Sequence, residues 1–194
     1  MLICKLCDQL GNQMFAYAAI KSISIDNGYG FRILRETDNR FLKNNVDKKF
    51  GCNVIDVFDV AKSEIIDYVP PNYSTFYEKM TFESESYFNN YALKVHDNTV
   101  MKGHYLCPKY FIHHIEEVRQ WFKFPIEIYD ESQRILFELR KKYAKEKKFC
   151  SVHFRNGLDY RIKGFLLSKD YWFDAAKEIL KKMRILYLLC YTIK

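Results

Sequence analysis

The chain has 194 residues, of which 48% are hydrophobic and 28% charged, and its formal net charge is +7. This composition is typical of a globular protein and excludes a disordered chain, and no apolar run approaches the ~20 residues of a membrane span. The start of the chain lacks the pattern of a secretory signal, so its six cysteines predict reduced thiols. We therefore expect a cytoplasmic protein, with at most a peripheral contact at the inner face of a membrane.

The positive charge is concentrated in the second half of the chain. Residues 1–100 hold 11 Lys and Arg against 13 Asp and Glu, whereas residues 101–194 hold 20 against 11. A positive field of this kind attracts anionic ligands such as nucleotides. The lysine-rich segments could equally be the solvated face of one helix. Binding to nucleic acid is a further alternative, but the sequence contains no recognised binding motif for it.

The first elements predict a parallel α/β fold. Leu2 to Leu6 is apolar enough for a buried strand, and residues 10–13 predict a tight turn into a helix that ends near Gly28. Such a layout aims backbone N–H groups at a ligand, so Gly11, Asn12 and Gln13 are candidate binding residues. The alternative is that Asn12 only caps the helix.

Cys4 and Cys7 have a spacing found in metal sites. The expected strand sends them to opposite faces, and no second cysteine pair follows. The sequence therefore predicts no zinc site there.

The remaining elements continue the α/β pattern, with one irregular part at about residues 35–97. The other expected elements are strands at 31–34, 99–106, 149–154 and 184–191, and helices at 112–122, after Asp130 and after Ser168. Many Tyr and Phe residues occur in the irregular part. They predict either the core of that region or a surface for an acceptor sugar.

Polar chemistry is concentrated where the strand starting at Phe149 ends. His153 and Arg155 share a face of that strand, and a guanidinium at a strand's carboxyl end suits a phosphate or carboxylate. Alternatively, Arg155 pairs with Asp159 to pin the loop, and His153 is a core residue.

Two stretches give the chain its resemblance to a known family. The segment Leu10-Gly11-Asn12-Gln13-Met14-Phe15, with Tyr17-Ala18, resembles the first signature of the alpha-1,2-fucosyltransferase family (glycosyltransferase family 11), with Asp8-Gln9 in place of two leading glycines. His153-Phe154-Arg155, with the later Asp159-Tyr160, resembles the family's second signature, His-x-Arg-Arg-Gly-Asp-Tyr. Residues 102–111 and 167–172 also look like the family.

The resemblance implies a two-lobed enzyme of the GT-B type. It would transfer L-fucose from GDP-fucose to the 2-hydroxyl of a galactose-terminated glycan, inverting the anomeric centre without a metal or other cofactor. It implies a Rossmann-like lobe over 1–148, including the irregular insertion, and the start of a donor-binding lobe over 149–194. Arg155 would meet the phosphates, with His153 and Asp159 positioning Arg155 or the nucleotide and Asn156 and Tyr160 lining the site.

The second signature is altered, since Asn156 replaces its second Arg and Leu158 is an extra residue. The chain also ends about one βα unit after Arg155, so we expect an incomplete second lobe. An inactive remnant of such an enzyme is therefore the first alternative to an active fucosyltransferase.

Overall fold

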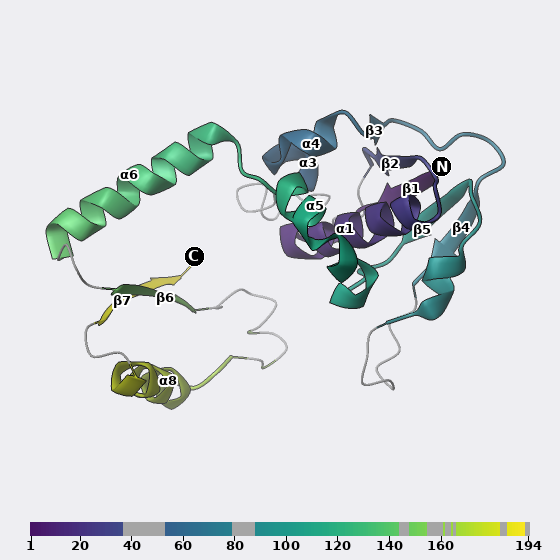
Figure 1. Cartoon of the computed structure of the whole chain (residues 1–194). Coiled ribbons are helices and arrows are strands. Elements are labelled where there is room, and N and C mark those ends of the chain that lie inside the picture. The colour runs from purple at the N-terminus through teal and green to yellow at the C-terminus, as the bar shows by residue number, and fades with distance from the viewer. Residues whose placement is uncertain are drawn as a thin grey trace. The chain divides into compact units, whose positions relative to one another are not determined.

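The structure is a computed structural model that describes residues 1–36, 53–78, 88–143, 148–154, 161, 164, 166–182 and 186–192 (Figure 1). The chain divides into two compact units, Met1–Ile126 and Glu127–Lys194. The boundary falls at the first residues of a helix, so that helix groups with the second unit. The expected division of an enzyme into lobes at residues 148 and 149 stays a prediction.

The first unit contains a parallel sheet of five strands in the order β3-β2-β1-β5-β4. The α/β fold with a parallel sheet, as predicted from the sequence, is confirmed. Its strands are β1 (Leu2–Lys5), β2 (Phe31–Leu34), β3 (Ile65–Ile66), β4 (Ser74–Tyr77) and β5 (Thr99–Lys102). Its helices are α1 (Leu10–Asp26), α3 (Val54–Val57), α4 (Asp59–Lys62) and α5 (Ile115–Trp121), with 3-10 turns η1 (Asn90–Lys94), η2 (Pro108–Tyr110) and η3 (Ile112–His114).

Strand β1 lies at the centre of this sheet and is buried on both faces. Leu2 and Cys4 belong to the main core, which α1, α3, α4, η1, η2 and α5 share. Ile3 points to the opposite face, where it packs with Leu34 and Val100. A strand covered on both sides needs an unbroken apolar run, and Leu2-Ile3-Cys4 supplies it.

Helix α1 begins earlier than the sequence suggested. Residues 10–13 form its first turn, so the predicted tight turn at these positions is wrong. The chain reverses before them, at Asp8, whose φ of 57° is in the left-handed region. The C-terminal end of α1 agrees with the predicted end near Gly28, because Gly28 takes a left-handed φ of 68° just beyond the helix.

A polar network ties α1 to the start of β3. The Lys21 ammonium donates hydrogen bonds to Glu64 Oε1 at 2.6 Å and to the Tyr17 hydroxyl at 2.8 Å, and that hydroxyl donates to Glu64 Oε2 at 2.7 Å. Burial and the bond to Glu64 raise the pKa of Tyr17, so it stays a donor. Each partner satisfies the others, which makes the partly buried charge pair tolerable.

The irregular part holds more regular structure than its sequence pattern indicated, including β3 and β4. Phe76 and Phe88 pack against the main core and Tyr73 against the smaller cluster. Tyr68, Tyr77 and Tyr91 are exposed, so only part of the aromatic set forms core, and the surface for an acceptor sugar stays a prediction. Phe82 and Tyr87 lie outside the described residues.

The second unit contains a two-stranded parallel sheet. Its elements are α6 (Ile126–Tyr143), β6 (Lys148–Phe154), α8 (Lys169–Lys182) and β7 (Leu186–Thr192), and β6 pairs with β7 from Lys148 opposite Leu186 to Phe154 opposite Thr192. The predicted helix start at Asp130 is wrong, because α6 already begins at Ile126. The predicted cap of the next helix is confirmed, since the Ser168 hydroxyl accepts a hydrogen bond from the Tyr171 N–H. Within the described parts of the chain, no helix combines the length and apolar character that crossing a membrane requires.

Candidate functional site at the carboxyl edge of the sheet

β1 and β5 are neighbours in the sheet of the first unit, and because they are parallel their carboxyl ends lie at the same edge. From β1 the chain passes through α1 to β2 on one side, whereas β5 is reached from β4 on the other side. In open α/β sheets ligands bind outside the carboxyl ends of the strands. The segments that follow β1 and β5 are therefore the first place to look for a site.

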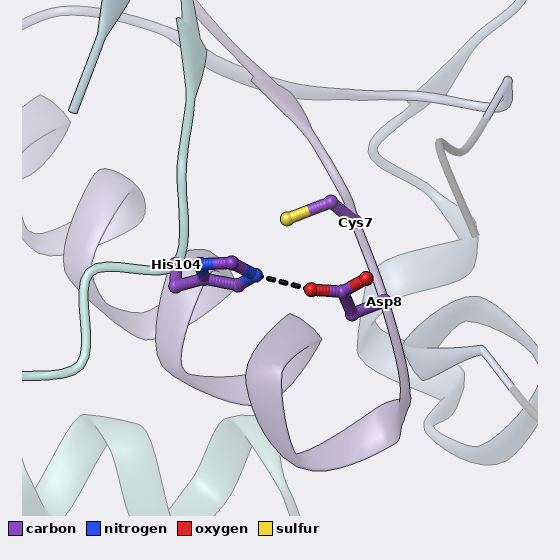
Figure 2. Close-up of side chains that lie close together, drawn as sticks. All are labelled: Cys7, Asp8 and His104. Atoms are coloured by element: carbon purple, nitrogen blue, oxygen red, sulfur yellow. Dashed lines mark hydrogen bonds and ion pairs between the residues drawn. The ribbon is translucent and has the colours of Figure 1, made fainter. Parts of the chain in front are cut away.

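Three chemically reactive side chains meet at this position (Figure 2). Cys7 and Asp8 follow β1, and His104 follows β5. The Asp8 carboxylate oxygen Oδ2 is paired with Nε2 of His104, and the Cys7 thiol donates to the Gly103 carbonyl oxygen at 3.5 Å. The Asp8 and His104 side chains are 32% and 29% exposed, so a solute can reach them although their packing holds them.

The loop that carries His104 is held in an uncommon backbone conformation. Gly103 has a φ of 144° and Tyr105 a φ of 52°. Glu78, just after β4, fixes this loop, because its carboxylate accepts hydrogen bonds from the Tyr105 N–H and, at 2.9 Å, from the Tyr110 hydroxyl. Burial raises the pKa of Glu78, while these hydrogen bonds act in the opposite direction. The geometry of His104 is thus set by its neighbours before any ligand arrives.

Gln13 fixes the segment that carries Asp8. Its side-chain amide is fully buried and donates to the Asp8 carbonyl oxygen at 2.8 Å and to Asn53 Oδ1 at 2.9 Å. Its Oε1 accepts from the Val54 N–H at 2.9 Å. The amide therefore bridges the β1–α1 connection and the start of α3.

The left-handed φ of Asp8 leads to a testable prediction about this segment. A residue with a Cβ loses about 1 kcal/mol or more in this region relative to glycine. Asp8→Gly and Asp8→Ala both remove the pairing with His104, so their difference isolates the backbone. We expect Asp8→Gly to be the more stable of the two by about 1 kcal/mol in urea unfolding. Equal stabilities would contradict the backbone assignment.

A second cluster lies at the end of α1. The two carboxylate oxygens of Asp26 pair with Nε2 of His113 at 2.9 Å and Nε2 of His114 at 2.8 Å. Partial burial acts to raise the pKa of Asp26, but the hydrogen bonds from His114 and His113 outweigh it and hold the pKa below its usual value. This cluster joins α1 to η3 at a more exposed position than the first.

The candidate binding residues of the first signature all lie in the first turn of α1. Gly11 is exposed and Asn12 half-buried, and Asn12 does not cap the helix, whose N-cap is Gln9. A Cβ built on Gly11 meets no atom within 4 Å, so the folded chain itself does not require glycine there. The Gln13 amide hydrogen-bonds to Asp8, Asn53 and Val54 of the protein itself.

The candidate residues of the second signature are only partly described. His153 is in β6, one residue before its end, and it lies opposite Tyr191 of β7. The side chain of His153 is outside the described parts of the structure. Arg155, Asn156, Asp159 and Tyr160 also lie outside the described residues.

Sequence reasoning did not single out Asp8, His104 and Glu78. Asp8 gave one signal, because it stands where the resembling family has a glycine, and its left-handed φ is a glycine-like conformation. His104 lies within the strand predicted at 99–106, and only the structure shows that β5 ends before it, at Lys102. Glu78 gave no such signal, because it follows β4, whose four residues are mostly exposed and show no clear pattern.

The arrangement suits two kinds of chemistry. An imidazole oriented by a carboxylate can accept a proton from a bound hydroxyl group. A thiolate, a carboxylate and an imidazole directed toward one another can together bind a metal ion.

Comparisons of the chain with models of protein families, with curated proteins and with solved structures find no match.

Proposed function

We propose that the chain is a glycosyltransferase of the alpha-1,2-fucosyltransferase type, which transfers L-fucose from GDP-fucose to a galactoside 2-hydroxyl. The observation that carries the proposal is where the two resembling stretches fall. The first, from Leu10, comes directly after the segment that follows β1, and the second, from His153, spans the carboxyl end of β6. Both strands are parallel to their neighbours, and carboxyl ends of parallel strands are where α/β proteins bind ligands.

The backbone at Asp8 adds support to the proposal. The resembling family has glycine at this position, and a φ of 57° is a conformation that glycine adopts at no steric cost. Tyr110 and Phe111, within the stretch 102–111 that also resembles the family, are both buried in the main core. The family's glycine at position 8 thus matches the backbone conformation found there, and the resembling residues Tyr110 and Phe111 match packing needs of the first unit.

The chemistry of the proposed reaction explains why a guanidinium is needed in the second unit. Negative charge grows on the β-phosphate as GDP leaves the sugar, and a fixed cation must stabilise it. Arg155 follows directly on the last residue of β6, and its planar fork can bind two phosphate oxygens at once. With Asn156 in place of the second Arg, this chain offers one guanidinium fewer than the family signature.

Calorimetric titration of the purified chain with GDP and GDP-fucose tests the proposal. We expect saturable binding of GDP at one site, and weaker binding of ADP as the matched control. Release of GDP from GDP-fucose that depends on a β-galactoside acceptor would identify an active enzyme. GDP binding without turnover would identify an inactive remnant. A chain that is folded by circular dichroism but binds neither nucleotide would contradict the proposal.

A further inference from the structure

We propose that Cys7, Asp8 and His104 bind a zinc ion. This inference does not depend on the proposed transferase activity, and it departs from the metal-free expectation that the resemblance gave. It rests on the three donor atoms that the chain brings together beyond the carboxyl ends of the neighbouring strands β1 and β5.

The donor atoms are already close to the separation that zinc requires. The Cys7 sulfur, an Asp8 carboxylate oxygen and a ring nitrogen of His104 all lie within 4.8 Å of one another. In a tetrahedral site with zinc–ligand distances of about 2.0–2.3 Å, neighbouring donors are about 3.5 Å apart. To bind zinc, Asp8 and His104, which are now paired directly, would move slightly apart, and the Cys7 side chain would turn toward them. In Figure 2 Cys7 and Asp8 extend from the β1–α1 connection toward the His104 ring.

The segments that carry these donors are fixed independently of the metal. Gln13 holds the Asp8 carbonyl oxygen, and Glu78 holds the Tyr105 N–H next to His104. The Cys7 thiol is oriented by the Gly103 carbonyl oxygen, which belongs to the same loop as His104. Little conformational freedom is therefore lost when an ion binds, and this favours affinity.

The chemistry of the donor set selects zinc among common ions. Magnesium and calcium prefer oxygen ligands throughout, whereas a thiolate and an imidazole with one carboxylate match the ligands of zinc. Zinc would replace the thiol proton of Cys7 and the proton between Asp8 and His104, and both protons would leave to solvent. Three protein ligands leave a fourth position for water or for an oxygen of a bound solute.

The cluster of Asp26, His113 and His114 offers an internal comparison. It also places three possible ligands within 4.8 Å, but it lacks a thiol and two of its members are exposed. Metal binding at that cluster and at the Cys7 site can be told apart, because only the latter involves sulfur.

Titration with Co²⁺, a spectroscopic substitute for zinc, tests the proposal together with calorimetric titration of Zn²⁺. We expect one Zn²⁺ per chain and a thiolate-to-cobalt absorption band that Zn²⁺ abolishes. Cys7→Ser should remove the band, and Asp8→Asn and His104→Gln should each weaken Zn²⁺ binding at least tenfold. The control variants are Cys150→Ser, which removes a half-buried thiol in β6, and the double variant His113→Gln/His114→Gln. Both should bind as the parent does.

Several results would overturn the proposal. They are a folded parent chain that binds no Zn²⁺, a cobalt band that survives Cys7→Ser, and a loss of binding in either control variant. Cys7→Ser conserves size, so circular dichroism is expected to show a folded protein. If His104→Gln fails to fold, Cys7→Ser and Asp8→Asn still decide the question. Nucleotide is absent from all these titrations, so their outcome is separate from that of the GDP experiment.

Discussion

Replacing Gly103 with alanine is expected to lower the free energy of unfolding of the first unit by about 3 kcal/mol. A Cβ at this position would lie 2.6 Å from Cβ of Glu78 and 3.3 Å from Cε2 of Tyr105. The backbone φ of 144° adds strain for any residue with a side chain. Relief of the close contact would require Glu78 to move. Its carboxylate would then leave the Tyr105 N–H, and the His104 loop would lose this hydrogen bond. Urea unfolding monitored by circular dichroism measures the effect.

Gly11→Ala is the matched control for this substitution. Gly11 lies in a helix, and a Cβ there meets nothing within 4 Å. Alanine at that position should leave stability unchanged or raise it by up to about 1 kcal/mol, because it has the higher helix propensity. If both alanine variants had similar stability, the tight contact between Gly103 and Glu78 would be contradicted.

Arg155→Ala is expected to weaken GDP binding by about 2 kcal/mol, or roughly 30-fold. The substitution removes both the charge and the planar fork that bind phosphate oxygens in the proposed function. Arg155→Lys keeps the charge without the fork, so it should recover only part of the affinity. Calorimetric titration of the two variants and the parent with GDP gives the comparison directly.

The competing interpretation of Arg155 makes a different prediction for the same proteins. If Arg155 only pins its loop through Asp159, Arg155→Ala should lower the melting temperature and leave GDP affinity unchanged. That combination would rule out the phosphate role. Asn156→Arg is the complementary variant, and tighter GDP binding is expected from it if the family's second cation is what this chain lacks.

The sequence predicted the regular elements with strong apolar patterns. β1, β2, β5, β6 and β7 all overlap segments whose runs of apolar residues indicated strands. β3 and β4 were not predicted, because Ile65-Ile66 is too short for a pattern and Ser74–Tyr77 is mostly exposed. Their pairing depends on neighbours distant in the chain, and that information is absent from local periodicity.

The candidate site also depends on contacts between residues distant in the chain, which local sequence patterns do not reveal. Cys7 was considered only with Cys4, since sequence spacing suggested that pair, yet its partners in the fold are Asp8 and His104, the latter 97 residues away. The parallel pairing of β1 with β5 brings Cys7, Asp8 and His104 together. It runs from Leu2 opposite Thr99 to Lys5 opposite Lys102. The sequence showed that both strands exist, but not that they are neighbours.

The central position of β1 has a consequence for how the chain folds. β1 is synthesised before the other strands of the sheet, and it pairs with β2 after about 30 residues, but its other edge is unpaired until Thr99–Lys102 has been made. During that interval the growing chain presents an apolar strand with free backbone N–H and C=O groups, which can pair with other chains. Contacts of such long sequence separation also slow folding. Refolding of the first unit should therefore be limited by the arrival of β5, and aggregation should compete with this step more than with any later one.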